Sequence, residues 1–204
     1  MMKPTHTRLA ILGTMSDLHR ELLPYDLACL RKIIAEGAPD LLCAEVTLAD
    51  WEQSQLAAAE LEVREALVPV VNTTDIVLVP VAPSRKKYGE FAVETGWRKQ
   101  IAQVGLNTLR WGQRKAARPQ AIHGYLFGAF CHTICALTEA SWTAEERAEW
   151  NRQNQSMVDN ILQVVRRDPG RRVLVVVQCQ RMHRLKQVLK AHTGELEIVR
   201  YQHL

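Results

Sequence analysis

The sequence lacks the features that mark secreted, membrane-spanning or disulfide-rich proteins. It has five cysteines, an odd number, and Cys29, Cys43 and Cys179 fall within helix-like or strand-like segments rather than loops. The most apolar stretch, residues 122–137, is too short to span a bilayer and contains two histidines. No long apolar segment with a small-residue cleavage site stands near its start. We therefore expect a cytoplasmic protein that does not associate with a membrane.

The motifs that would indicate a nucleotide site or a compact zinc site are also missing. Four glycines recur between residues 89 and 112, but no strand-like run leads into a glycine-rich turn there, which excludes a phosphate-binding loop. Cys131 and Cys135 stand four residues apart on an apolar helical segment, a pattern more typical of core packing than of metal ligation. No HExxH motif occurs. Any metal site would need ligands from distant parts of the chain.

The charge is small overall but unevenly distributed. The net charge is +4, yet residues 36–65 carry eight acidic residues against one arginine, and residues 85–118 carry nine basic residues against two glutamates. Complementary segments of this kind can pair between subunits, which allows a homo-oligomer, or they can simply be two solvated helix faces. A nucleic-acid-binding protein would more often be basic throughout. We expect no nucleic-acid partner.

Short apolar runs predict the strands of one α/β domain. At 204 residues the chain suits a single domain, residues 1–204. The third run contains Pro80, which indicates an edge strand or a bulge. Helical patterns between the runs predict a single α/β domain with a mostly parallel central sheet of about four to five strands, flanked by helices. The runs are residues 8–14, 41–46, 75–82, 171–177 and, with a weaker pattern, 195–201.

Helical periodicity fills the intervals between these strands. Pro24 can open a first helix that Gly37 closes, and Thr143 with Glu146 matches a capping box for a helix that runs to Arg167. The remaining predicted helices cover residues 47–66, residues 85–137 with a division at Pro119, and the segment from residue 182 onward.

One helical stripe is notable for its large apolar side chains. Trp97, Ile101, Val104 and Trp111 recur at helical spacing, and Thr108 places a polar residue at the intervening position of the stripe. Stripes of this kind are more often buried than used to bind a cofactor. We expect these four side chains to belong to the core.

Polar side chains follow the strands at the edge where ligands bind in open parallel sheets. Connecting loops at the carboxyl ends of such strands can place polar groups without disturbing the packed sheet. These residues define the predicted site. Asp17, His19 and Arg20 follow the first strand, Glu45 ends the second, Ser84 and Arg85 follow the third, and Gln178, Gln180, Arg181 and His183 follow the run at 171–177.

Glu45 is the most informative of these residues. It ends an apolar strand, where an unpaired charge costs several kcal/mol unless a cation or hydrogen-bond donors meet it. His19 or His183 can pair with the carboxylate and so be oriented as a general base. Arg20 or Arg181 can instead neutralise it.

A divalent metal ion would satisfy Glu45 in a third way. His19, Glu45 and His183 form a two-histidine, one-carboxylate set that can leave coordination positions open for water. The metal would lower the pKa of that water and generate a nucleophile. A structural role also remains open for two residues. His183 can lie on a solvated first turn, and Asp17 can simply cap a turn.

The order of these motifs resembles the TraB, ChaN and erythromycin-esterase superfamily, particularly its small bacterial members. The glycine and threonine at 13–14 and the strand-ending Glu45 correspond most closely. The sequence departs from the family at Ser16, where relatives often have histidine, and after the strong strand, where His183 is displaced by two residues. The segments that carry the resemblance are residues 11–14 with His19 behind them, 39–45, 157–161 and 173–177. The resemblance implies hydrolases of lactones or peptides, some of them metal dependent, or a haem-binding lipoprotein.

These observations lead to a main hypothesis and two rivals. In the first, a hydrolase of a small ester, lactone or amide uses His19 or His183 to activate water, Glu45 orients the base or binds a divalent metal, and Arg20 or Arg181 stabilises negative charge. In the second, the same rim binds a small anionic ligand without catalysis, through Arg20, Arg85 and Arg181. In the third, the charged segments mediate self-association.

Overall fold

The computed structural model describes residues 6–91 and 96–204 and contains a five-stranded sheet in which every pairing is parallel. The spatial order of the strands is β3-β2-β4-β1-β5. Pro80 lies on β3, an edge strand, as its missing N–H requires. The predicted α/β fold is confirmed. The strands are β1 (Thr7–Thr14), β2 (Leu41–Ala44), β3 (Val77–Pro80), β4 (Arg172–Gln178) and β5 (Leu196–Ile198).

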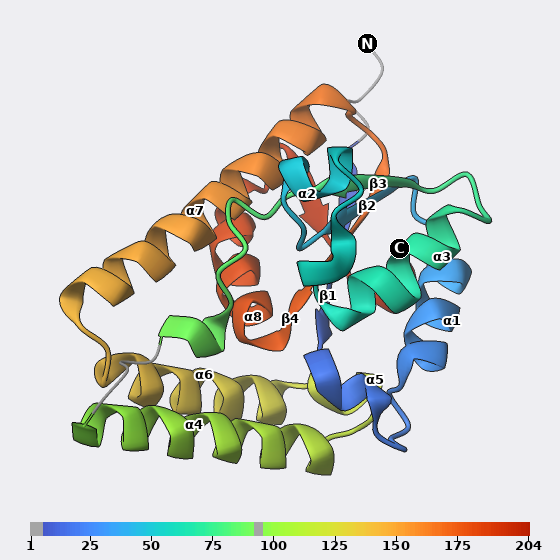
Figure 1. Ribbon diagram of the computed structural model, residues 1–204. Helices are drawn as coiled ribbons and strands as arrows, with labels where there is room; N and C mark the ends of the chain where they lie inside the picture. Colours follow the sequence, from blue (N-terminus) through green and yellow to red (C-terminus); the bar gives the residue numbers. More distant parts are fainter. Residues whose placement is uncertain (1–5, 92–95) are drawn as a thin grey trace.

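Helices surround this sheet (Figure 1). The capping box at α7 is present as predicted, because the Thr143 hydroxyl accepts from the Glu146 N–H and the Glu146 carboxylate accepts from the Thr143 N–H. The helices are α1 (Leu27–Gly37), α2 (Leu48–Glu52), α3 (Val68–Val71), α4 (Gly96–Lys115), α5 (Pro119–Ile122), α6 (Tyr125–Ala140), α7 (Ala144–Arg167) and α8 (Cys179–Leu189). Part of the helical run predicted for residues 85–137, namely 92–95, lies outside the described residues.

The helix predicted for residues 47–66 is broken into short pieces. After α2, Ser54 adopts a positive φ of 54°, a short 3-10 turn η2 (Leu56–Ala58) follows, and a π-helical turn η3 (Val63–Leu67) leads into α3. Two ion pairs reach this segment from the loop after β3, namely Arg85 with Asp50 and Lys87 with Glu60. Contacts with a distant segment therefore accompany the irregular course of the chain here, which local helix propensity does not predict.

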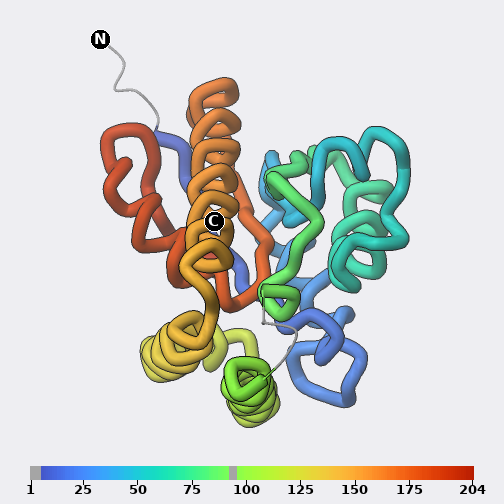
Figure 2. The backbone as a smooth tube through the Cα atoms, turned by 60° about the vertical axis from the view of Figure 1, so that its left-hand side comes forward, coloured from blue at the N-terminus to red at the C-terminus, as the bar shows by residue number. Residues whose placement is uncertain are grey.

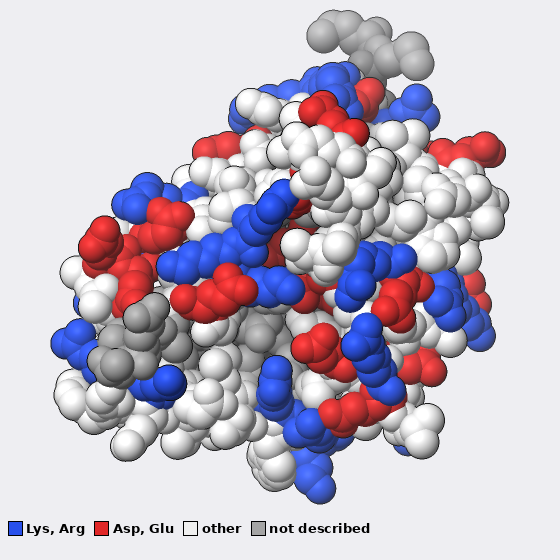
Figure 3. Space-filling model, viewed as in Figure 1, with Lys and Arg blue, Asp and Glu red and all other residues white. Residues whose placement is uncertain are grey.

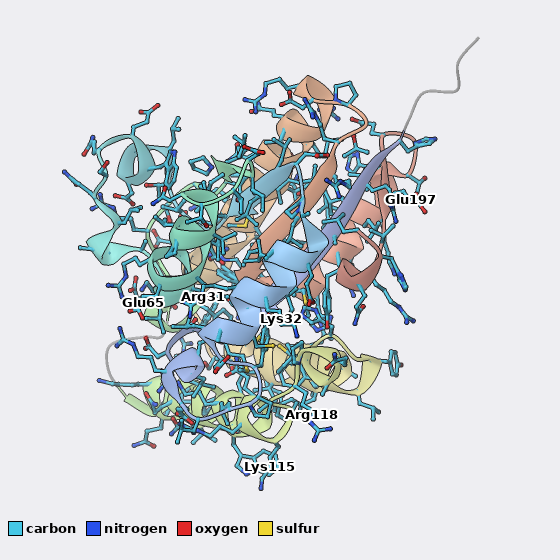
Figure 4. The ribbon with its side chains drawn as sticks, turned by 90° about the vertical axis from the view of Figure 1, so that its right-hand side faces the viewer. Arg31, Lys32, Glu65, Lys115, Arg118 and Glu197 are labelled. Atoms are coloured by element: carbon cyan, nitrogen blue, oxygen red, sulfur yellow. The ribbon has the colours of Figure 1, made fainter. Side chains whose placement is uncertain are left out.

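Alternating strand residues pack against helices on opposite faces of the sheet. One face carries α1, where Leu30 and Ile34 contact the sheet, and Figure 4 shows this helix in front with Arg31 beside Glu65. The other face carries α7 and α8 (Figure 2). This alternation is the two-residue period of a strand buried on both sides. The first face uses Ala10, Leu12, Leu42, Ala44, Leu174 and Val176, and the second uses Leu9, Ile11, Leu41, Cys43, Val173 and Val175.

The chain leaves the two central strands in opposite directions. β1 and β4 are neighbours in register, with Thr14 opposite Gln178. After β1 the chain continues through η1 (Ser16–Arg20) to α1 on one face, whereas after β4 it enters α8 on the other. Connections that diverge from adjacent parallel strands open a crevice between them, which is where α/β sheets bind ligands.

Helices α4 and α6 form a hairpin along the carboxyl edge of the sheet, the lower layer in Figures 1 and 2. Two glycines on α4 let the helices approach closely. A Cβ on Gly105 would lie 2.0 Å from the Thr138 Oγ1, and one on Gly112 would lie 2.2 Å from the Phe130 ring. The small residues are therefore required by the packing of the hairpin.

The apolar stripe of α4 faces outward, so its prediction as core is wrong. Trp97 is 64% exposed and Trp111 is 58% exposed, and Ile101 and Val104 are also exposed. Helical periodicity identifies an apolar face but does not say which neighbour it meets. The face that α4 does bury consists of smaller or polar residues, including Ala102, Leu109 and Gln113. Within the described residues, no helix has the length and apolar character needed to cross a bilayer.

Replacing Gly112 with alanine tests the close packing of the hairpin. The new methyl group would collide with Phe130, so we expect Gly112→Ala to lower the free energy of unfolding by about 1–3 kcal/mol in urea denaturation. Gly37→Ala at the end of α1 is the control, because nothing lies within 4 Å of the added Cβ. A Gly112 variant as stable as the Gly37 variant would contradict the packing described.

Candidate functional site

Glu45 meets an arginine at the carboxyl edge of the sheet. Its Oε1 accepts from the Arg181 Nε at 2.7 Å, and its Oε2 accepts from the Gln178 backbone N–H at 2.9 Å. The Arg181 side chain is only 2% exposed. Of the partners predicted for Glu45, the structure therefore selects Arg181, which neutralises the carboxylate within a buried ion pair.

Arg181 is satisfied on every side of its guanidinium group. The group lies 4.0 Å from the centre of the Trp150 ring, in a cation–π contact. It also donates to the Asn154 and Gln153 side-chain oxygens and to the Lys86 carbonyl, at 3.3–3.4 Å. Its contacts account for its burial. Arg181 is thus a bridge between β2, α7 and α8, and not the free anion-binding group predicted from the sequence.

His19 is held by the backbone and makes no hydrogen bond to Glu45. Its Nε2 accepts from the Met15 N–H at 2.9 Å, and its Nδ1 donates to the Tyr25 carbonyl at 2.8 Å. Burial lowers the pKa of the imidazole, although the Tyr25 carbonyl acts in the opposite direction. Because both ring nitrogens are used, His19 orders the loop after β1. The predicted role of His19 as a base beside Glu45 is not supported by this geometry.

His183 lies on α8 against α6, among groups different from those around Glu45. A Cβ on Gly128 of α6 would lie 2.5 Å from the His183 Cε1. Burial lowers the pKa of this imidazole, and Lys186 adds to the effect. Among the described residues, no three histidine, cysteine or carboxylate side chains are arranged to hold a metal ion. The predicted metal set of His19, Glu45 and His183 is therefore not assembled, because each histidine is bound into a different part of the fold.

The other predicted residues divide between ion pairs and a cleft. Arg20 pairs with Glu65 at 3.0 Å, and Arg85 forms a bidentate pair with Asp50. These two arginines are already neutralised. Ser84 accepts from the Lys86 N–H and, with Arg85 and Glu45, lines a small hollow beside α2. Asp17, Gln178 and Gln180 line the larger cleft between the carboxyl ends of β1 and β4.

We call this larger space the rim cleft. It has a volume of about 370 Å³, large enough for a small molecule, and lies at the divergence of β1 and β4. Most of the residues that line it are polar, with Glu60 and Lys87 on one wall and residues of the hairpin helix α4 on another. The polar residues that line it are Ser16, Asp17, Glu60, Lys87, Tyr88, Glu90, Gln103, Arg110, Gln113, Gln178 and Gln180.

Two buried carboxyl groups beside this cleft were missed by the sequence analysis. Glu60, which is 8% exposed, pairs with Lys87 at 3.0 Å. Burial raises the pKa of Glu60, with the Lys87 ammonium opposing the change. Burial also raises the pKa of Glu62 to about 8, and the nearby charge of Glu60 adds to the rise. The acidic, helix-like pattern of residues 47–66 predicts one continuous helix and gives no signal that these two residues are buried.

Glu62 hydrogen-bonds to the threonine that ends β1. The Thr14 hydroxyl contacts the Glu62 Oε1 and lies 3.2 Å from the Val177 carbonyl. The hydrogen bond that the Thr14 hydroxyl donates to Glu62 lowers the pKa of this carboxyl, whereas burial raises it and is the larger cause. The raised pKa favours a protonated Glu62 at neutral pH.

The acidic and basic segments of the sequence meet within the chain. Asp50 and Glu60 from the acidic segment pair with Arg85 and Lys87 from the basic one. Figure 3 shows the corresponding intermixing of positive and negative side chains near the centre of the face viewed. Intramolecular pairing thus uses part of the charge that the sequence offered for self-association. The homo-oligomer stays a prediction.

The chain has no recognisable relatives in the comparisons with known proteins. No family model matches it, and neither the curated proteins nor the solved structures contain a match. The resemblance to the TraB, ChaN and erythromycin-esterase superfamily therefore stays a prediction, and function must be argued from the site itself.

Removing the buried arginine tests the importance of the Glu45–Arg181 pair. Arg181→Met would leave the Glu45 carboxylate without its cation, and we expect the free energy of unfolding in urea to fall by about 3–5 kcal/mol. Arg20→Met is the control, since it breaks an exposed ion pair and should cost at most about 1 kcal/mol. Equal losses of unfolding free energy in the two variants would contradict a larger contribution from the buried pair than from the exposed pair.

The pH dependence of stability tests the state of Glu62. Because burial raises the pKa of Glu62 from its ordinary value of 4.5 to about 8, the unfolded state releases this proton first as pH rises. Stability contributed by this group is therefore complete below pH 4.5 and lost between pH 4.5 and 8, at no more than about 1.4 kcal/mol per pH unit. Glu62→Gln should flatten this decline in urea denaturation measured from pH 5 to pH 8. Glu65→Gln, which alters an exposed carboxylate, should retain the wild-type slope.

Proposed function

We propose that the protein is a hydrolase-like enzyme that binds a small polar ester, lactone or amide in the rim cleft. The observation that carries the proposal is the burial of the Glu60 carboxyl on the cleft wall, beside the partly exposed Lys87. A carboxylate whose pKa is raised by burial is a stronger base than an exposed one, so it can take a proton from water near neutral pH. The position of the cleft at the divergence of β1 and β4 supports substrate binding there.

The residues around Glu60 suit the steps of such a hydrolysis. Glu60 accepts a proton from water as the water oxygen attacks the substrate carbonyl carbon. The Lys87 ammonium and the Arg110 guanidinium, both on the cleft wall, stabilise the negative charge that develops on the carbonyl oxygen. The C–O or C–N bond then breaks, and the leaving oxygen or nitrogen receives the proton from Glu60. Gln178 and Gln180 can orient the substrate by hydrogen bonding.

Noncatalytic binding in the same cleft is the second candidate. It is favoured by the Glu60–Lys87 contact itself, because a carboxylate already paired at 3.0 Å is a weaker base than a free one. Catalysis requires that the substrate displace Lys87 from Glu60, or that Lys87 contact Glu60 and the substrate at the same time. A protein that only binds would keep the ion pair and use Gln178, Gln180 and Arg110 for recognition.

Substitution of Glu60 separates the two candidates. With a panel of small esters, lactones and amides, we expect Glu60→Gln to lower kcat/KM by a factor of about 10²–10⁴ while substrate binding persists. The wild-type rate should rise with pH through the raised pKa of Glu60, and this limb should be missing from the variant. Glu65→Gln is the matched control. Turnover that survives Glu60→Gln undiminished would refute the assigned base, and binding without any turnover would favour the noncatalytic candidate.

A further inference from the structure

A second cleft, separate from the rim cleft, lies on the side of α8 that faces α5, α6 and the C-terminal segment. We call it the basic cleft. It has a volume of about 780 Å³ and is open on one side. Its walls come from the turn after α5, the first half of α6, one face of α8, and the segment from β5 to the 3-10 turn η6 (Tyr201–His203). No residue lines both clefts.

Three cations gather on this cleft without a matching acid. Lys186 and Lys190 lie on and just after α8, and Arg200 follows β5. Among residues 6–91 and 96–204, no carboxylate lies within 4.0 Å of any of their charged nitrogens. Burial and the charges of Lys190 and Arg200 lower the pKa of Lys186. Like charges held together in a partly buried cleft are unfavourable unless an anion joins them.

The same walls contain hydrogen-bonding groups that have no partner. His123 Nε2, His183 Nε2 and Tyr201 Oη are all buried, and within the part of the chain that the structure describes none of them makes a hydrogen bond. They come from three different elements, and the His123 and Tyr201 rings lie 5.0 Å apart between centroids. Buried polar groups in folded proteins nearly always have partners. Three such groups lie behind the wall of one cleft, so this wall is polar beneath its surface.

We propose that the basic cleft binds an organic phosphate monoester. A phosphate group has two negative charges and several acceptor oxygens, which suit the ammonium and guanidinium donors of Lys186, Lys190 and Arg200. The volume of the cleft is much larger than a phosphate ion, and part of its lining is apolar, from Ile198, Val199 and the exposed ring of Tyr125. The ligand is therefore expected to carry an aromatic or aliphatic body beside its phosphate.

Adenosine 5′-monophosphate, adenosine and inorganic phosphate are suitable probes for titration calorimetry at constant ionic strength. We expect the monophosphate to bind and adenosine to show no binding at the same concentrations, because adenosine lacks the charged group. Inorganic phosphate should bind more weakly than the monophosphate, because it leaves the apolar wall uncovered. Equal affinity for adenosine and its monophosphate, or no heat from the monophosphate at 10 mM, would overturn the proposal.

Variants of the cations give a second and independent readout. Lys186→Gln and Arg200→Gln should each weaken binding of the monophosphate by about tenfold or more. Without ligand, both variants should unfold at a higher urea concentration than the wild type, since each removes repulsion among the three cations. Lys32→Gln, an exposed lysine on α1, is the matched control and should leave binding unchanged. Unaltered affinity in the Lys186 and Arg200 variants would exclude this cleft as the binding site.

Discussion

The buried ion pair between Glu45 and Arg181 is the contact on which the carboxyl edge of the sheet depends. It joins the end of β2 to the first turn of α8, and the other contacts of Arg181 reach α7 and the loop after β3. Taking two charges out of water is costly, so such a pair stabilises a fold only when hydrogen bonds satisfy both groups. Here the Gln178 N–H completes the set around the carboxylate, and Trp150 covers the guanidinium. The pair thereby fixes the relative positions of four elements around one point.

The carboxylate of that pair also makes a small contribution to the electrostatics beside the rim cleft. The charge of Glu45 acts on Glu60 and Glu62 and helps to raise the pKa of both. Burial is the larger cause for each of the two groups. The ion pair and the two carboxyl groups with raised pKa values are thus neighbours at this edge of the sheet. The first holds the sheet edge together, and the second provides the proton-accepting chemistry that we propose for the cleft.

Much of the architecture could be predicted from the sequence because strands buried on both faces have a strong apolar signature. β1 and β4 were located to within a residue at their starts, and the capping box fixed the beginning of α7. Glu45 was identified because a charge at the end of an apolar strand requires a partner. The sequence could not choose among the candidate partners, since that choice depends on how α8 lies across β4. The two histidines failed as partners for the same reason, because one is bound by the backbone at β1 and the other faces α6.

The missed residues have a common physical origin. Glu60 and Glu62 were placed on a solvated helix, and the stripe of α4 was placed in the core, because periodicity describes one element at a time. In the structure, ion pairs from the loop after β3 accompany the break in the expected helix and bury its acids. The hairpin of α4 and α6 covers the sheet edge, and the face that α4 buries includes Ala102, Leu109 and Gln113. Trp97 and Trp111 therefore point outward. Both errors arise where the chain bends to meet a distant segment.

Helix α8 lies between the two clefts, and the charged groups at its two ends have opposite signs. Its amino-terminal end meets the Glu45 carboxylate through the Gln178 N–H, where the partial positive charge of a helix dipole favours an acid. His183, Lys186 and Lys190 follow at spacings of three and four residues, so they share one face of the helix and its extension toward the basic cleft. Lys186 and Lys190 stand near the carboxyl-terminal end, where the dipole favours cations. One helix thus holds an acidic group at its start and cations toward its end.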